Sequence, residues 1–508
     1  MDAEDRQETH PLERAARDDP DALALVDGDR RLSRGRWEER ATRLANALAA
    51  ELGMEPGDRA AIRVASRIEY FELTFALAKL RVHAMPVPRD LGPDELRRAL
   101  ALTGARLLVE DGTAHGGDVH SRVTVSVGDA PADASGESLE ALIDSGSAES
   151  RPISGSPPGD ALVLTSGTSG RPKVAVRAAD PGRADAVRAT YEDLFGALGF
   201  HTGDRHLLAG TVDHTMPAFY ARHTLERGGA VVIMRHFEPG EALELLAAER
   251  ITSAFLGPDM LNRLTAHAAD APAPPDLSQL RAVMSGGTDL PSELADRVDE
   301  LLGPGRLFDL YGTVETGLVT VAGEGERRRA PGSVGRPLAG VELRILASDG
   351  SPAPKGTAGR IAVRAPTLVE GYLEEPEATA EAFTDGFFAP GDVGRTDEEG
   401  HLFVLDRVAD VIHVAGVEIL PSDVERVLRE DPAVLDAAAV ADSEGGERVR
   451  AAVEARPGMG VDTDALLRRC AEVLPRHAVP DVLEVVEELP RTALGKVVRR
   501  TVREHLLA

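Results

Sequence analysis

The sequence has one cysteine, few lysines and no long apolar segment. Among its 508 residues Cys470 is the single cysteine, so neither an intramolecular disulfide nor a cysteine-based metal cluster can form. No apolar run approaches the length that crosses a bilayer. Residues 1–5 have neither the basic start nor the apolar core of a signal peptide. We therefore expect a soluble, cytoplasmic protein.

Positive charge is also scarce. The chain has 57 Lys and Arg against 85 Asp and Glu, a formal net charge of −28 at pH 7. Such a surface repels phosphate backbones and anionic lipid, so we expect no nucleic-acid partner and no membrane partner. Any phosphate site must then be built locally, from backbone N–H groups and a few cations. The only lysines are Lys79, Lys173, Lys355 and Lys496.

Between about residues 36 and 310, short apolar runs alternate with stretches of helical periodicity. The runs predict strands at 60–64, 161–164, 230–234, 254–256 and 282–284, and the periodicity predicts helices at 37–52, 70–80 and 241–249. This alternation predicts parallel sheets covered on both faces by helices. By contrast, residues 128–160 are rich in Ser, Gly, Pro and Asp, which predicts a surface linker.

The pattern changes after residue 330. Residues 341–346, 360–363 and 401–405 predict a small antiparallel β unit. Beyond residue 407, helices at 421–429 and from 463, with strands at 434–440 and 449–453, predict an α+β domain. A chain of 508 residues also exceeds one compact core, so two or three domains are expected.

Residues 164–173 have the most specific pattern in the chain. After an apolar strand they join hydroxyls, glycines and one lysine in a single loop. Glycines let backbone N–H groups close around phosphate oxygens, hydroxyls add donors, and the lysine supplies charge. The spacing is not that of a Walker A loop, because Lys173 follows Gly170 by three residues and precedes Val174. The predicted phosphate-binding residues are Thr165, Ser166, Gly167, Thr168, Ser169, Gly170 and Lys173.

This loop resembles the phosphate loop of the adenylate-forming superfamily, which includes acyl-CoA synthetases, peptide-synthetase adenylation domains and beetle luciferases. The resemblance continues in order through nearly the whole chain and is greatest to the acid–CoA ligases. It implies an α/β fold with a large N-terminal part, residues 1–405, made of two doubly wound α/β units and a small β unit. A mobile C-terminal α+β domain, residues 406–508, completes the expected architecture.

The segment of residues 308–315 resembles the family's second signature, Tyr-Gly-x-Thr-Glu. The resemblance places Tyr311 against adenine, makes Asp309 the acceptor for the adenine amine and assigns Mg²⁺ to Glu315. Gly312 and Thr313 complete the turn. These roles suit the side chains, since a ring stacks and a carboxylate oxygen is a hard ligand for magnesium.

Two further elements resemble nucleotide-binding segments of the family. Asp392 corresponds to the residue that accepts from the ribose hydroxyls, and Arg407 to the residue that contacts ribose or phosphate. Gly286, Gly287 and Thr288 belong to the turn that lines the adenine and acid pockets.

Two residues are expected to act in catalysis. His214, between a strand and a helix, matches the aromatic position at the acid pocket, where a lone histidine would otherwise be structural. Lys496 lies in the family's last motif. Attack of an acid on the α-phosphate builds negative charge, which a positioned ammonium stabilises.

The sequence departs from the family pattern at two positions. Val314 stands where a threonine usually donates to the AMP phosphate, and Thr313 cannot be assumed to replace it. Ala409 stands where an Asp or Lys usually forms the pivot of the C-terminal domain. Asp213, the neighbour of His214, is an ambiguous partner for a substrate amine. The absence of a long insertion after Glu315 counts against the fatty acyl-AMP ligase subgroup.

The resemblance implies ATP and Mg²⁺ as cofactors and a small-molecule acid as substrate. The acid is converted to its AMP anhydride with release of pyrophosphate, then transferred to a nucleophile, most commonly coenzyme A. The alternatives are loading of a carrier protein, or a diazotase that adenylates nitrite and acts on an aryl amine. A nucleotide-binding protein without turnover is disfavoured because Lys173, Glu315 and Lys496 are all present.

Overall fold

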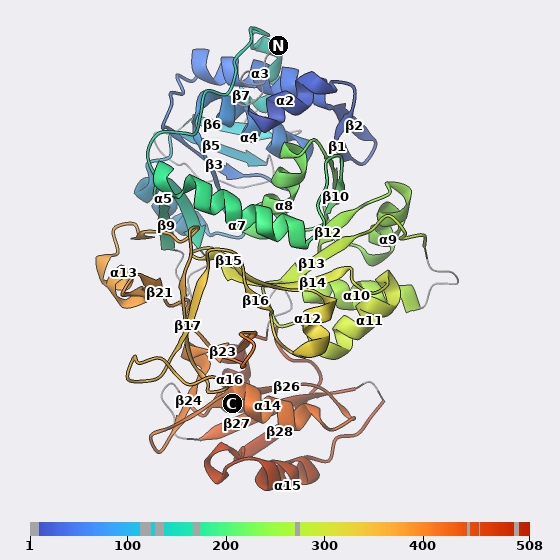
Figure 1. Ribbon diagram of the computed structural model, residues 1–508, viewed down its shortest axis with the longest axis vertical. Coiled ribbons are helices and arrows are strands. Elements are labelled where there is room, and N and C mark those ends of the chain that lie inside the picture. Colours follow the sequence, from blue (N-terminus) through green and yellow to red (C-terminus); the bar gives the residue numbers. More distant parts are fainter. Residues whose placement is uncertain are drawn as a thin grey trace.

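The chain folds into several α/β layers, with the C-terminal residues at the end of the molecule opposite the N-terminus (Figure 1). The structure, a computed structural model, describes residues 10–111, 123–127, 137–165, 173–269, 275–443, 448–456, 458–491 and 497–507. Within these residues no helix is long and apolar enough to cross a membrane. The expected α/β class is confirmed, with a separate small C-terminal unit.

The first α/β unit is a five-stranded parallel sheet in the order β4-β3-β5-β6-β7. Its helix α3 begins because Ser33 accepts a hydrogen bond from the Arg36 N–H. Trp37, Leu44 and Leu48 on this helix are buried against the sheet side of the unit. The elements are β3 (Arg59–Arg63), β4 (His83–Pro86), β5 (Leu107–Asp111), β6 (Val123–Val127), β7 (Glu137–Ser138), α3 (Arg34–Ala50), α4 (Ile68–Leu80), α5 (Pro93–Thr103) and α6 (Leu139–Ser145).

The prediction of a surface linker at residues 128–160 is wrong for part of that segment. Within its described portion, β7 joins the sheet and α6 packs on α3. Leu139, Leu142 and Ile143 are buried in the core of the first unit. Their spacing of three and four residues forms one apolar helix face, a signal that the surrounding polar composition concealed.

The second unit contains a nine-stranded sheet in the order β16-β15-β14-β13-β12-β10-β11-β1-β2. Its central strands are parallel, and β2, β15 and β16 add antiparallel edges. The parallel strands place the ends of β13 and β14 side by side, with Gly286 opposite Leu310. The strands are β1 (Leu23–Asp27), β2 (Arg30–Ser33), β10 (Arg205–Leu208), β11 (Ala230–Ile233), β12 (Ser253–Phe255), β13 (Ala282–Gly286), β14 (Leu307–Thr313), β15 (Gly317–Ala322) and β16 (Arg336–Pro337).

Seven helices accompany these strands in the described chain. The first, α2, packs on α3 and α8 near the N-terminus. Figure 1 shows α7 beside α8, and the rings of Tyr191 and Phe219 join them at a centroid distance of 5.1 Å. The helices are α2 (Pro11–Asp18), α7 (Ala184–Ala197), α8 (Thr215–Glu226), α9 (Pro239–Ala248), α10 (Pro258–Ala269), α11 (Ser292–Leu302) and α12 (Glu324–Arg329).

Two smaller sheets are built from strands of residues 161–407. One is a three-stranded sheet, β19-β9-β8, and the other is the expected antiparallel β unit. Helix α13 (Pro376–Ala382) lies beside β19 and β20. The strands are β8 (Ala161–Thr165), β9 (Lys173–Arg177), β17 (Glu342–Leu346), β18 (Gly359–Arg364), β19 (Gly371–Tyr372), β20 (Phe383–Thr384), β21 (Phe387–Phe388), β22 (Asp392–Thr396) and β23 (Leu402–Arg407).

The C-terminal unit is an α+β structure around the sheet β26-β27-β28. It meets β23 through Asp406, whose Oδ2 accepts from the Ser422 hydroxyl at 2.5 Å. Arg499 lies 3.7 Å from the same carboxylate. The elements are β24 (Ile412–Val414), β25 (Val417–Ile419), α14 (Pro421–Arg429), β26 (Val434–Ala441), β27 (Val449–Ala455), α15 (Thr463–Val473), β28 (Val482–Val486) and α16 (Arg499–Leu507).

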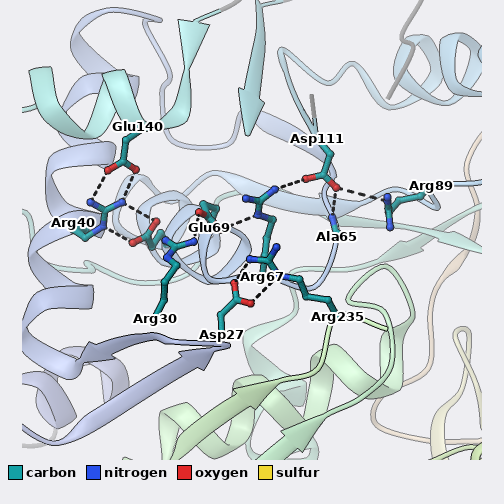
Figure 2. Close-up of polar contacts among 11 residues, drawn as sticks. Asp27, Arg30, Arg40, Ala65, Arg67, Glu69, Arg89, Asp111, Glu140 and Arg235 are labelled. Atoms are coloured by element: carbon teal, nitrogen blue, oxygen red, sulfur yellow. Dashed lines mark hydrogen bonds and ion pairs between the residues drawn. The ribbon is translucent and has the colours of Figure 1, made fainter. Parts of the chain in front are cut away.

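A network of ion pairs fastens the first unit together (Figure 2). Arg40 on α3 holds two carboxylates at once, with Nε 2.5 Å from Glu72 Oε1 and Nη2 2.7 Å from Glu140 Oε2. Beside it, Arg67 bridges Glu69 and Asp111 at 2.9 and 3.2 Å. The pairs of Arg40 with Glu72 and of Arg67 with Glu69 and Asp111 are buried, so removing one partner would leave an uncompensated charge.

Candidate active site

Thr165 and Lys173 face each other at the ends of two antiparallel strands. Thr165 ends β8, Lys173 begins β9, and the two residues are paired across the hairpin. Thr165 is buried, and its hydroxyl oxygen has no hydrogen-bond partner among the described residues. Five of the predicted phosphate-loop residues, Ser166, Gly167, Thr168, Ser169 and Gly170, lie outside the described residues.

Lys173 and Glu315 both contact one tyrosine, Tyr372. The Lys173 Nζ lies 4.6 Å from the centroid of the Tyr372 ring and 4.0 Å from Glu375 Oε2. The Tyr372 hydroxyl donates to Glu315 Oε1 at 3.0 Å. Burial, followed by the charge of Glu315, raises the pKa of Tyr372, so the hydroxyl remains a donor. The predicted phosphate-loop cation and the predicted magnesium ligand are therefore brought to one place.

Sequence reasoning did not identify Tyr372 or Glu375. Tyr372 belongs to the two-residue strand β19, which pairs with β9 opposite Ala175. A strand of two residues has no measurable alternation, and its partner lies about two hundred residues earlier in the chain. Only the tertiary pairing of β19 with β9 places the tyrosine beside Lys173.

Tyr311, Asp392 and Arg407 meet where β14 approaches the antiparallel unit. The Tyr311 hydroxyl donates to Asp392 Oδ2 at 2.6 Å, and Arg407 Nε lies 2.8 Å from Asp392 Oδ1. Asp392 and Arg407 are paired residues of β22 and β23, and Asp392 is buried. Burial and the Asp392 charge raise the pKa of Tyr311. The three residues that the sequence assigned to base and ribose thus form one connected group.

Asp309 is a buried carboxyl group, and the charge of Asp289, an exposed residue, acts on it. Burial raises the pKa of Asp309 to about 8, and the charge of Asp289 acts in the same direction. At neutral pH most Asp309 side chains are consequently protonated, so this group offers both a donor and an acceptor.

Two glycines allow the strands around this carboxyl to approach closely. A Cβ on Gly286 would lie 2.7 Å from the Leu310 carbonyl oxygen, and one on Gly312 would lie 2.2 Å from the Gly317 carbonyl oxygen. Gly287 has a φ of +90°, which L-residues with a side chain rarely adopt. The glycines predicted to line the pocket are thus required by local backbone geometry, and Thr288 follows them at the end of β13.

Thr313 and Val314, at the turn after β14, both make hydrogen bonds in the structure. The Thr316 N–H donates to Thr313 Oγ1 at 3.2 Å, and the Thr313 N–H donates to Thr316 Oγ1 at 3.0 Å. The Thr313 hydroxyl is therefore engaged within the turn. The Val314 carbonyl accepts from Arg177 Nη2 at 3.2 Å. A guanidinium accordingly lies beside the position where the family has a threonine.

His214 occupies the N-cap position of α8 and is exposed. The preceding loop is held by Ser66, whose hydroxyl donates to the Gly210 carbonyl at 2.9 Å and accepts from the Val212 N–H at 3.2 Å. Asp213 Oδ2 accepts from the Arg89 N–H at 3.1 Å. One oxygen of Asp213 is therefore already bonded to the main chain, and the carboxylate helps to hold the loop that carries His214.

The two remaining predicted elements lie in the C-terminal unit. Lys496 is outside the described residues. Ala409 belongs to a single 3₁₀ turn, Val408–Asp410, directly after β23.

The donor set fits ATP with magnesium. Thr165 and Ser285 are buried and have hydroxyl oxygens without a partner in the described part of the chain. Groups of three or more His, Cys, Asp or Glu able to hold a metal are absent from the described residues. Magnesium usually keeps several waters and binds through one or two carboxylates and substrate phosphates, so a single carboxylate such as the predicted ligand Glu315 would suffice.

Comparisons with known proteins agree with this geometry. The model of the AMP-binding enzyme family matches residues 12–373, and the model of the AMP-binding enzyme C-terminal domain matches residues 423–496. Feruloyl-CoA synthase of an Amycolatopsis species is 32% identical over 507 residues, covering 96% of this chain and 97% of the relative. The 2-succinylbenzoate–CoA ligase of Geobacillus kaustophilus is 32% identical over 489 residues, covering 95% of each.

Solved structures have the same arrangement over nearly the whole chain. The amide bond synthetase McbA of Marinactinospora thermotolerans has a TM-score of 0.81 and 28% identity, and covers 97% of this chain and 99% of its own. ATP-bound MatB of Rhodopseudomonas palustris has a TM-score of 0.84 and 26% identity, and covers 98% of this chain and 99% of its own.

Proposed function

The chain belongs to the AMP-binding enzyme family, and we propose that it transfers an adenylated acid to coenzyme A. It is an AMP-forming, acid–CoA ligase-like enzyme, and it uses ATP with Mg²⁺. The observation that carries the proposed site is the meeting of Lys173, Tyr372 and Glu315 in one cluster. In this cluster Lys173 supplies a positive charge for the phosphates, and Glu315 supplies a carboxylate for magnesium.

We propose that the base and ribose bind between β13, β14 and β22. Tyr311 stacks on the adenine, Asp309 bonds its amine, and Asp392 accepts from the ribose hydroxyls. Support comes from the burial of Asp392 and its bonds to Tyr311 and Arg407, which fix the carboxylate before any ligand arrives. Such preorganisation lowers the cost of ordering the site on binding.

In the first step, a carboxylate oxygen of the acid forms a bond to the α-phosphorus, and the bond to the departing pyrophosphate breaks. The phosphate loop and Lys173 hold the phosphates, and bound Mg²⁺ supplies positive charge for them. Lys496 stabilises the charge that develops at the α-phosphate. We assign the guanidinium of Arg177 to the phosphate side that Val314 leaves without a hydroxyl, because it lies against the Val314 carbonyl.

In the second step, the thiolate of coenzyme A attacks the acyl carbon and AMP leaves. We propose that residues 1–405 form the adenylation core and that residues 406–508 move as one domain between the two steps. The hinge then includes Ala409, directly after β23. Coenzyme A is supported as acceptor by the two relatives whose names are CoA synthase and CoA ligase.

An amine is the second candidate acceptor. A solved amide bond synthetase covers 97% of this chain with a TM-score of 0.81, so the same architecture is compatible with an amine. His214, exposed at the start of α8, is assigned to the boundary of the acid pocket in either reaction.

One experiment separates these reactions. The purified chain is incubated with ATP, Mg²⁺ and either a panel of carboxylic acids or nitrite. Pyrophosphate release is measured without acceptor, with coenzyme A, with an aryl amine and with a carrier protein. We expect acid-dependent pyrophosphate release and a thioester with coenzyme A. If pyrophosphate release requires nitrite and an aryl amine and no carboxylic acid is active, the proposed ligase activity is wrong and the enzyme is a diazotase.

A further inference from the structure

The segment that contains β19 joins the phosphate hairpin to the turn after β14. The Val369 N–H donates to the Glu315 carbonyl at 2.9 Å. Four residues later, the Leu373 N–H donates to the Val174 carbonyl on β9 at 2.8 Å. Tyr372 stands between these two bonds in the chain, so its main chain is fixed relative to both Glu315 and β9.

Helix α13 also fixes this part of the chain. The Tyr372 N–H donates to Thr379 Oγ1 at 2.9 Å, and that hydroxyl donates to the Glu375 carbonyl at 2.9 Å. A Cβ on Gly371 would lie 2.5 Å from Thr379 Cγ2, so the glycine allows β19 to approach this helix. The position of Tyr372 is therefore set by β9, by α13 and by the Glu315 turn together.

The Tyr372 side chain contacts a cation with its ring and a carboxylate with its hydroxyl. Lys173 Nζ lies 4.6 Å from the ring centroid, and the hydroxyl donates to Glu315 Oε1 at 3.0 Å. In the part of the chain that the structure describes, Glu315 Oε2 accepts no hydrogen bond, and Lys173 forms an ion pair only with Glu375, at 4.0 Å. A direct bond between Lys173 and Glu315 would occupy both charges before a ligand arrives. Tyr372 holds each charge and leaves both available.

We propose that Tyr372 is a positioning residue of the ATP site with two separable roles. Its hydroxyl orients Glu315 through Oε1 and leaves Oε2 for Mg²⁺. Its ring holds the ammonium of Lys173 for the phosphates. The inference rests on the proposed function, because it needs ATP and Mg²⁺ to bind at this cluster. A tyrosine that served only packing would have no specific effect on the response to Mg²⁺.

The test is the binding of ATP to the full-length protein without any acid, measured by titration calorimetry with excess Mg²⁺ and again with EDTA. Tyr372→Phe keeps the ring and removes the hydroxyl, so the gain in ATP affinity that Mg²⁺ provides should fall by about 3-fold to 10-fold. The ATP affinity of this variant in EDTA should equal that of the wild type. Tyr372→Leu removes the ring as well, so its ATP affinity in EDTA should fall by about 2-fold to 5-fold.

Two controls separate these roles from a general effect on the fold. AMP lacks the β- and γ-phosphates, so its affinity for both Tyr372 variants should equal its affinity for the wild type. Tyr70→Phe, at a buried tyrosine on α4 in the core of the first unit, is the matched substitution and should keep all of these affinities.

The role of the hydroxyl is overturned if Tyr372→Phe keeps the full effect of Mg²⁺. The role of the ring is overturned if the Leu and Phe variants bind ATP equally in EDTA. Equal losses of ATP and AMP affinity would mean that Tyr372 serves only the fold. If the wild type itself binds no ATP in the presence of Mg²⁺, the proposed function fails, and not only the role of Tyr372.

Discussion

The Tyr311 hydroxyl donates to Asp392 at 2.6 Å, and this bond joins the nine-stranded sheet to the antiparallel β unit. Arg407 binds the other oxygen of the same carboxylate at 2.8 Å. Both oxygens of a buried carboxylate are therefore held by residues 81 and 15 positions away in sequence. The proposed ribose site depends on this three-residue group.

Asp392→Ala should weaken AMP binding by about 10-fold to 100-fold, because it removes charged hydrogen bonds to the ligand and leaves Arg407 without this partner. Tyr311→Phe, which removes one hydroxyl, should weaken it by about 3-fold to 10-fold. Titration calorimetry with AMP measures both, and Glu381→Ala, an exposed change on α13, serves as control. Unchanged AMP affinity in Asp392→Ala would show that the ribose lies elsewhere.

Asp309 should make stability depend on pH. Its folded pKa of about 8 is above the value of about 3.9 expected in an unfolded chain. The folded state thus binds the proton more tightly, so this stabilisation is complete below about pH 4 and is lost as the pH rises through about 8.

Asp309→Asn keeps a neutral group of similar size, so the stability of this variant should not fall as the pH rises through about 8. The Tm of the variant, measured by calorimetry, should rise relative to the wild type between pH 5 and pH 9. Asp185→Asn, at an exposed site on α7, should show a constant difference. A pH-independent difference for Asp309→Asn would mean that Asp309 is ionised throughout this range.

Ser66 should position the loop that carries His214. Ser66→Ala leaves the Gly210 carbonyl and the Val212 N–H without their hydroxyl partner. We expect KM for the acid to rise by about 3-fold to 10-fold with KM for ATP unchanged, because small displacements at a substrate-positioning loop reduce activity. Steady-state pyrophosphate assays measure both constants. Ser145→Ala, which removes an exposed bond to Glu51, is the matched control, and a parallel rise in both constants would indicate general destabilisation instead.

Lys496→Ala should lower kcat for pyrophosphate release by about 10²-fold to 10³-fold, because the ammonium acts on charge that exists only in the transition state. ATP binding, measured by calorimetry, should change little. Lys355→Ala is the control, since this exposed lysine lies 3.9 Å from Glu398 on the surface. Equal losses in ATP affinity and in rate would assign Lys496 to ground-state binding.

The fold class, the order of the elements and the local motifs could be predicted from the sequence. The helix predicted at 421–429 coincides with α14, and the strands predicted from 161 to 284 correspond to β8, β11, β12 and β13. These predictions succeeded because periodicity and glycine placement are local properties. The predicted linker at 128–160 failed in part because its polar composition hid the short apolar face of α6.

Which side chains meet follows from the packing of elements that lie far apart in the chain. Tyr372 reaches Glu315 and Lys173 because a two-residue strand pairs with β9, and no local pattern encodes that pairing. Val314 looked like a simple loss of a donor, yet the fold brings Arg177 to its carbonyl. Likewise, the protonation of Asp309 depends on burial and on Asp289, which are set by how β13 and β14 lie together. Contacts between distant residues depend on the packing of whole elements, which is why sequence spacing alone could not supply them.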